Sequence, residues 1–202
     1  MDILGFDVKA LFTTTGTVVA YLLAFGIIFA ESSIIFFLPG DSFIIAAALL
    51  ASQGIFNIWV LLLLMFLAAV IGNNLGYYLG SRYGRQLFNK EKSLLFDRKH
   101  IERSEKFYAR YGPMTIVLAR FVPMVRTVAP ILAGVGNMNY TTFFSYNIIG
   151  ALLWVFGLGL SAYYIGGLIP NVDKYILPFI IIVILLSVLP GALSLLRAHQ
   201  KR

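Results

Sequence analysis

The hydrophobic residues of this chain lie in long runs that are interrupted by few charges. A helix needs about 20 apolar residues to cross the hydrocarbon core of a bilayer. Runs that approach or reach this length predict transmembrane helices at residues 17–30, 55–81, 140–166 and 175–196. The whole chain, residues 1–202, is therefore predicted to be a single membrane domain, an all-α polytopic membrane protein.

Charged residues are concentrated in two segments, which predict the side of the membrane on which the loops lie. The loop 82–110 and the tail from Arg197 carry most of the basic residues. Short basic loops stay in the cytoplasm, so both segments are predicted to be cytoplasmic. Residues 82–111 are also expected to contain an amphipathic helix. Since 59% of the residues are hydrophobic and only 12% are charged, the net charge of +7 reflects this orientation, and no nucleic-acid partner is expected.

The stretch 112–138 is apolar but begins and ends on the cytoplasmic side in this topology. The last helix, 175–196, must start outside, and the helix before it, 140–166, must therefore start inside. Residues 112–138 must then cross the membrane an even number of times, and they are too few for two complete crossings. They are predicted to form a re-entrant hairpin that turns near residues 123–126.

The amino-terminal half predicts the same arrangement in the opposite sense. If the amino terminus is cytoplasmic, residues 17–30 run outward and residues 55–81 run inward, so residues 32–52 enter and leave on the outer face. A re-entrant hairpin fits this segment. Hairpin and helix thus occur twice in opposite orientations, with flanking transmembrane helices, and such an inverted repeat is typical of transporters with a site near the bilayer midplane. The hairpin tips are predicted at Pro39, Gly40 and Pro123.

Two acidic and two basic residues lie in or beside these hairpins, at Glu31, Asp41, Arg120 and Arg126. An ionised group at membrane depth costs at least about 2.5–3.5 kcal/mol, so it usually faces a partner, a cavity or a substrate. Arginine binds phosphate through two parallel hydrogen bonds and stays charged when buried, so Arg120, Arg126 and Thr127 are predicted to bind a substrate phosphate. Glu31 and Asp41 can balance the arginines in the empty site and can also carry protons. The alternative is a purely structural set of ion pairs that holds the hairpins.

No arrangement of residues for catalysis is evident in the sequence. The chain has no cysteine, and its histidines, His100 and His199, lie in the predicted cytoplasmic segments. Because no nucleophile with a base and no metal-ligand motif is found, the chain is predicted to be no enzyme and to bind no metal or cofactor. A small-ion or drug antiporter would use the same acids but would need no pair of arginines.

The spacing of glycines in the predicted helix 55–81 and just after it bears on helix packing. Four glycines recur at every fourth residue: Gly72, Gly76, Gly80 and Gly84. They give one helix face without side chains, which lets another helix approach closely. The neighbouring Asn73 and Asn74 are expected either to line a cavity or to form hydrogen bonds between helices.

With these residues identified, the chain resembles the DedA family of bacterial membrane proteins, which share the VTT domain with eukaryotic lipid scramblases. The match extends over residues 25–165, nearly the whole chain. Its most specific segments are Glu31, Phe-Leu-Pro-Gly-Asp at 37–41, Gly-Asn-Asn-Leu-Gly-Tyr-Tyr-Leu-Gly at 72–80, and Arg-Phe-Val-Pro-Met-Val-Arg-Thr at 120–127.

The resemblance implies a multi-pass protein of the plasma membrane that transports polyprenyl phosphate, or more broadly a phospholipid flippase or scramblase, and that uses the proton motive force in some members. The family's essential acids correspond to Glu31 and Asp41, and its essential arginines to Arg120 and Arg126. The expected partners are a phosphate-bearing lipid, protons and the surrounding membrane lipids. The lipid's identity, the direction of transport and the oligomeric state stay open, with a homo-oligomer among the alternatives.

Overall fold

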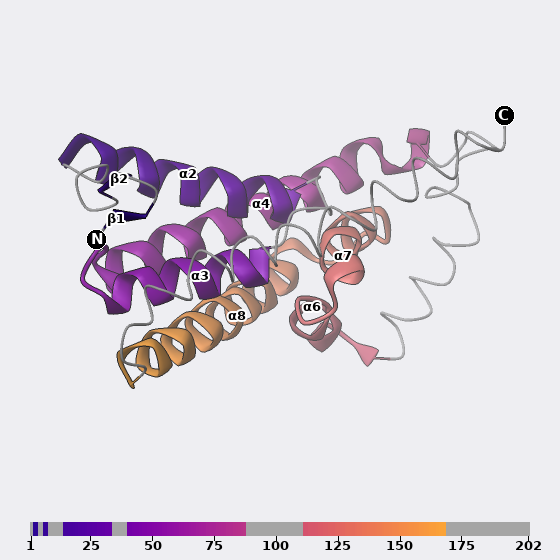
Figure 1. The fold of residues 1–202 in the computed structure, drawn as a ribbon. Helices are drawn as coiled ribbons and strands as arrows, with labels where there is room; N and C mark the ends of the chain where they lie inside the picture. Colours follow the sequence, from indigo (N-terminus) through magenta and orange to yellow (C-terminus); the bar gives the residue numbers. More distant parts are fainter. Residues whose placement is uncertain (1, 4–5, 8–13, 34–39, 88–110, 169–202) are drawn as a thin grey trace, which may run out of the picture. The chain divides into compact units, whose positions relative to one another are not determined.

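The computed structural model describes residues 2–3, 6–7, 14–33, 40–87 and 111–168. The regular structure within these ranges is helical, except for two very short strands that pair in antiparallel orientation. The elements are β1 (Asp2–Ile3), β2 (Phe6–Asp7), α2 (Thr14–Ser33), α3 (Gly40–Ser52), α4 (Ile58–Leu87), α6 (Met114–Ala119), α7 (Pro123–Val135) and α8 (Tyr140–Leu168) (Figure 1).

Three predicted features lie outside the described residues, and they stay predictions. They are the last transmembrane helix at 175–196, the hairpin residue Pro39, and the greater part of the loop 82–111 with its amphipathic helix.

The protein is an all-α membrane protein with three candidate spans among its described residues, Gly16–Ser33, Ile58–Tyr83 and Tyr140–Leu168. These helices correspond to the first three predicted spans in chain order. The main difference is that α4 runs on to Leu87, past the predicted end of its span. Large apolar side chains such as Leu153 of α8 are exposed on the helix surfaces, as expected for helices that face lipid.

The chain divides into two compact units, and each is described by itself. Unit 1 comprises Met1–Ile28, Phe37–Met65 and Val155–Arg202, and unit 2 comprises Phe29–Phe36 and Phe66–Trp154. The long helices α2, α4 and α8 each contribute residues to both units.

In unit 1, Asn57 determines where α4 begins. Its side-chain oxygen accepts hydrogen bonds from the backbone N–H groups of Trp59 (3.0 Å) and Val60 (3.2 Å), as a helix N-cap does. The backbone N–H of Asn57 also donates to the hydroxyl of Tyr21, at 2.9 Å, which ties the start of α4 to α2. Asp41 lies in the first turn of α3, where the helix dipole favours a negative charge.

In unit 2, the segment predicted as the second hairpin folds as two short helices, α6 and α7. Even the longer one, α7, has only 13 residues and thus a length of about 20 Å, short of the roughly 30 Å hydrocarbon core. The break falls at residues 120–122, just before Pro123 rather than within residues 123–126. Its cause is proline itself, which can open a helix but disfavours a helical conformation in the residue before it.

The same segment packs on α4 and α8 through an aromatic core. Tyr77 of α4 stacks on Phe143 of α8 with a centroid distance of 4.5 Å, and its hydroxyl donates to the carbonyl oxygen of Met138 at 2.5 Å. Phe143 is completely buried together with Ile116 of α6 and Ala133 of α7. This core places the short helices against the two long ones.

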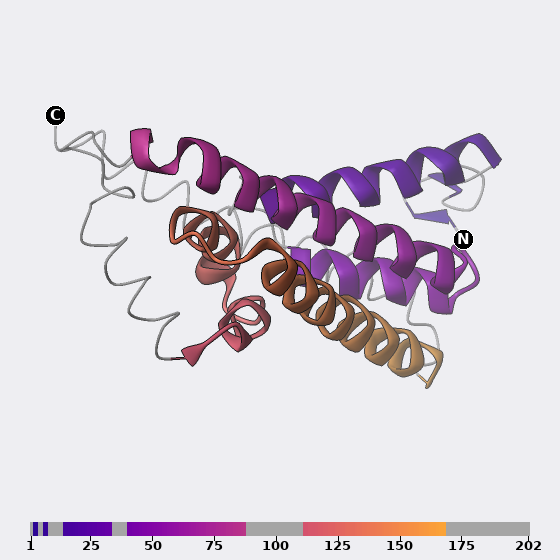
Figure 2. The same cartoon turned by 180° about the vertical axis from the view of Figure 1, so that it is seen from behind.

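Two glycines of α4, Gly72 and Gly80, allow its backbone to approach two other helices, which confirms the predicted packing role at these positions. A Cβ atom at Gly72 would lie 2.7 Å from the Cβ of Ser32 in α2, and one at Gly80 would overlap the carbonyl group of Ile131 in α7. Gly134 of α7 approaches the backbone of α4 in the same way. Figures 1 and 2 both show α7 beside the carboxy-terminal part of α4.

Gly80→Ala is expected to destabilise the protein, because the added methyl group would collide with the backbone of Ile131, which cannot turn aside like a side chain. We expect a loss of about 1–3 kcal/mol, measured by thermal unfolding in detergent. Gly26→Ala in α2 is the matched control, since no atom lies within 4 Å of a Cβ there. Equal unfolding temperatures for the two variants would contradict the close approach of α4 and α7.

Candidate functional site

The break between α6 and α7 carries both arginines that were predicted to bind phosphate. Arg120 caps the carboxyl end of α6, and Arg126 lies in the first turn of α7. Between them Val122 is extended, with φ −117° and ψ 107°, as residues before proline prefer. Its carbonyl oxygen accepts hydrogen bonds from the backbone N–H groups of Val125 (2.9 Å) and Arg126 (3.1 Å). This turn determines how the two arginines are spaced.

The burial of side chains at this break is the reverse of that in a soluble protein. Arg120 and Arg126 are only 3% and 7% exposed, whereas Phe121 and Val122 between them are 56% and 48% exposed. Apolar side chains turned outward are stable where the surroundings are lipid. Charged side chains turned inward need partners inside the protein or in a substrate.

Arg120 donates to neutral acceptors. Its Nη2 atom donates to Oδ1 of Asn147 at 2.5 Å and to the carbonyl oxygen of Ala69 at 3.4 Å. Asn147 is itself held in place, since its Nδ2 atom donates to the carbonyl oxygen of Val70 at 3.1 Å. The aliphatic part of Arg120 passes Gly150, where a Cβ atom would lie 3.0 Å from its Cδ.

Asn73 joins this network through its side-chain amide. In the orientation that gives both amide atoms suitable partners, its oxygen accepts from Nη2 of Arg120 at 2.9 Å and its nitrogen donates to the carbonyl oxygen of Ser32 at 3.0 Å. Of the two roles that the sequence left open for Asn73, the structure shows hydrogen bonding between helices. Because Ser32 follows Glu31 in α2, this contact also links Arg120 to the turn that carries Glu31.

Arg126 has a charged partner. Its Nη2 atom donates to Oε1 of Glu31, which lies in the last turn of α2 and is 1% exposed. Removing one member of such a buried pair typically costs about 3–5 kcal/mol, because the other charge is left uncompensated. The pair therefore holds the end of α2 against the start of α7.

Trp154 of α8 lies beside both arginines. The guanidinium carbon of Arg126 is 5.0 Å from the centroid of its ring system, and that of Arg120 is 5.9 Å away. Both distances fall within the roughly 6 Å range of cation–π attraction. Trp154 is 2% exposed, so these contacts are shielded from solvent.

Four of the predicted site residues are described in one unit: Glu31, Arg120, Arg126 and Thr127 are buried in unit 2. Asp41, in the first turn of α3, belongs to unit 1. Of the predicted hairpin tips, Gly40 is the first residue of α3 and Pro123 the first residue of α7. Within the described ranges, no group of three His, Cys, Asp or Glu side chains could hold a metal ion.

Sequence reasoning missed the part that α8 plays in the site. Asn147, Gly150 and Trp154 were not predicted to contact the arginines. Their spacing of three and then four residues puts them on one face of a helix, and an asparagine within an apolar run is a polar signal that could have drawn attention to this face.

Known proteins resemble the chain over most of its length. A model of the VTT domain matches residues 38–164. Protein DedA of Escherichia coli (strain K12) is 40% identical over 185 residues, which cover 90% of this chain and 84% of that protein. An uncharacterized membrane protein of Mycobacterium leprae is 34% identical over 177 residues (87% and 79%), and inner membrane protein YghB of E. coli is 31% identical over 150 residues (71% and 68%). No solved structure matches.

A cluster of buried charges inside apolar, membrane-spanning helices defines an integral membrane protein with an internal polar site. The matches over most of the chain narrow this class further: the chain belongs to the DedA family of membrane proteins.

Proposed function

We propose that the protein moves a phosphate-bearing lipid across the cell membrane, with Arg120 as the first binding group for the phosphate. One observation carries this proposal: among the described residues, the acceptors around Arg120 are two asparagine oxygens and a backbone carbonyl oxygen, all neutral. A buried guanidinium with neutral acceptors keeps its full positive charge, and an anionic substrate would compensate it.

Arg126 would take part by exchanging partners. A phosphate oxygen can replace the carboxylate of Glu31, since both accept the same planar pair of N–H donors. Glu31 then loses its counter-charge in a buried position and takes up a proton. In this mechanism Asp41 is the second proton-carrying group, so that proton movement and lipid movement are coupled.

The proposal also includes the orientation of the helices in the membrane. Residues 32–52 and 112–138 form re-entrant hairpins of opposite sense within an inverted repeat. Support comes from the shortness of α3, with 13 residues, and of the α6–α7 segment compared with the hydrocarbon core. The basic loop 82–110 and the carboxyl terminus would lie in the cytoplasm.

Polyprenyl phosphate is the substrate that we propose first, with a general phospholipid scramblase as the alternative. No chemical step, metal or cofactor is part of the proposal. A small-ion antiporter fits less well, because its substrate would not need a buried arginine with neutral acceptors. Reconstituted liposomes with labelled polyprenyl phosphate test the proposal, and equal transport of a labelled common phospholipid would favour the scramblase.

Arg120→Ala and Arg126→Ala are each expected to reduce transport of polyprenyl phosphate to background, because the site loses one of its cations. The lysine variants should recover little, since an ammonium group lacks the planar fork of donors. Initial transport rates in liposomes measure the effect. Arg82→Ala is the matched control, because Arg82 is exposed near the end of α4.

A second variant separates a loss of substrate binding from a loss of stability. Asn147→Asp would place a fixed carboxylate next to Arg120, where the asparagine oxygen lies at 2.5 Å. Because an aspartate cannot donate to the carbonyl oxygen of Val70 as Asn147 does, the unfolding temperature is measured on the same variant. Transport per folded protein should be lost, since the new charge competes with the phosphate. Full transport by Arg120→Ala or by Asn147→Asp would exclude phosphate binding at Arg120.

Glu31→Gln and Asp41→Asn are expected to abolish the dependence of transport on a pH gradient. An amide resembles the protonated acid in shape but cannot release a proton. Transport in liposomes with and without a gradient measures this, alongside thermal unfolding of the same variants. Unchanged gradient dependence in both variants would rule out these acids as proton carriers, and a loss of folded protein with coupling intact would indicate a structural ion pair.

Single cysteines that flank a re-entrant hairpin are expected to be labelled from one side of the membrane only. The natural chain has no cysteine to interfere. Tyr111→Cys and Asn139→Cys flank the second hairpin at exposed positions and should react from the cytoplasmic side, like the control Ser81→Cys. Gln53→Cys, after the first hairpin, should react from the outside. A membrane-impermeant maleimide on oriented vesicles gives the answer. Labelling of the two flanks from opposite sides would mean that 112–138 crosses the membrane.

A further inference from the structure

Three residues on one face of α8, spread over two helical turns, lie against the two arginines. Asn147 accepts a hydrogen bond from Arg120, and Gly150 leaves room for the aliphatic part of the same side chain. Trp154 comes one turn later and reaches both guanidinium groups. We call these three residues the arginine face of α8. Each of them meets a different part of the arginines, so the face determines where the two charges lie.

Trp154 differs from the other two residues because it contacts both arginines. Two guanidinium groups close to one indole ring repel each other, and only Arg126 has a carboxylate partner among the contacts described above. The negative charge on the faces of an indole ring attracts cations, and tryptophan is the strongest of the aromatic side chains in this respect. A buried ring also loses no side-chain freedom when an anion binds, because its position is already set.

We propose that Trp154 is a positioning residue that holds Arg120 and Arg126 at one spacing, so that both bind the same phosphate group. This inference rests on the proposed function and deepens it. In this proposal an uncharged residue contributes to the affinity for phosphate, in addition to the charges of the two arginines. Phosphate that bridges two cations fixed beside one ring needs no rearrangement of the arginines on binding.

The first test compares Trp154→Phe and Trp154→Leu in the liposome assay with polyprenyl phosphate. Because cation–π attraction is weaker for phenylalanine and absent for leucine, the KM for the lipid should rise moderately in the first variant and by roughly 2- to 30-fold in the second. The maximal rate per folded protein should change little. A purely structural role predicts the opposite: less folded protein and a lower maximal rate, with an unchanged KM in both variants.

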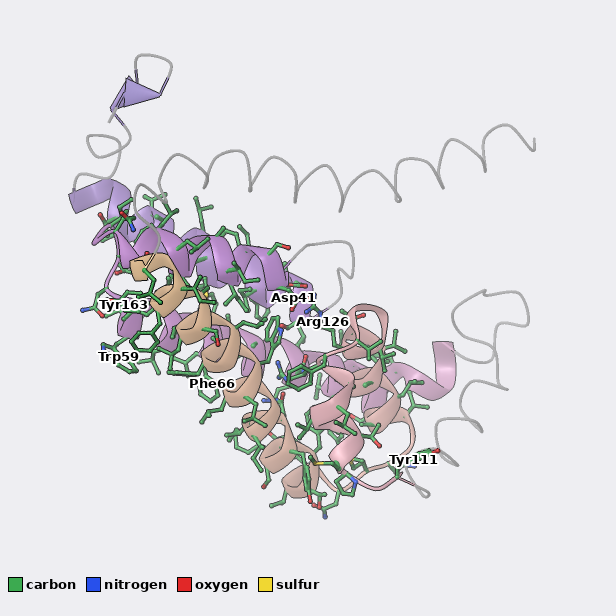
Figure 3. The ribbon with its side chains drawn as sticks, turned by 60° about the horizontal axis from the view of Figure 1, so that its bottom comes forward. Asp41, Trp59, Phe66, Tyr111, Arg126 and Tyr163 are labelled. Carbon is green, nitrogen blue, oxygen red and sulfur yellow. The ribbon has the colours of Figure 1, made fainter. Side chains whose placement is uncertain are left out.

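The second test uses the fluorescence of Trp154. The chain has two tryptophans, and the other one, Trp59 in α4, is 60% exposed (Figure 3). Trp59→Phe therefore leaves the buried Trp154 as the single tryptophan emitter. Phosphatidic acid in detergent micelles should change its emission in a saturable manner, because the guanidinium groups beside the ring acquire a negative partner. Diacylglycerol with the same acyl chains, which lacks the phosphate, should leave the emission unchanged.

The outcomes separate the two proposals. If the natural protein transports polyprenyl phosphate but Trp154→Leu has the same KM, or if phosphatidic acid leaves the Trp154 emission unchanged, the positioning role is wrong and the proposed function stands. If the natural protein transports no phosphate lipid, both proposals are wrong. A raised KM in Trp154→Leu, partial recovery in Trp154→Phe and a saturable change in emission together establish the positioning role.

Discussion

The burial of positive charge inside apolar helices is the constraint on which the architecture of unit 2 depends. Arg120 and Arg126 are almost completely buried, and an unsatisfied charge at such a site would cost several kcal/mol. Partners must therefore come from neighbouring helices. Glu31 comes from α2, the carbonyl oxygen of Ala69 and the side-chain oxygen of Asn73 come from α4, and Asn147 comes from α8. Short helices with a break between them can turn two charged side chains inward within a few residues, which one continuous helix could do less easily.

Glycine makes this arrangement sterically possible. The donors and acceptors of the network meet only if the helix backbones come within a few ångströms of one another. Gly72 lets α2 approach α4, Gly80 and Gly134 let α4 and α7 touch backbone to backbone, and Gly150 gives Arg120 its path along α8. A methyl group at any of these positions would push apart the helices or side chains that the polar contacts join. The close packing of the helices and the polar network therefore depend on the same glycine positions.

Much of this could be predicted from local patterns, and the remainder depends on contacts between distant residues. Runs of apolar residues indicated α2, α4 and α8, and proline before Arg126 indicated an interrupted helix, because both signals act over neighbouring residues. The partners of the arginines could not be found in this way. Asn73 and Asn147 are 74 positions apart, and an asparagine in an apolar helix is equally compatible with a cavity and with a contact between helices. Only the packing of the helices decides between these roles.

The two arginines are not equivalent, and their difference bears on how lipid and proton movement could be coupled. The buried charged side chains of the described residues are Glu31, Arg120 and Arg126, which together carry one positive charge. A phosphate group with two negative charges would leave this set with one negative charge in excess, and protonation of Glu31 would restore neutrality. Under the proposed exchange, uptake of the proton thus follows from the cost of an unbalanced charge in an apolar environment. A neutral residue at Arg120 would leave two negative charges in excess when the phosphate binds, so protonation of Glu31 alone could no longer restore neutrality.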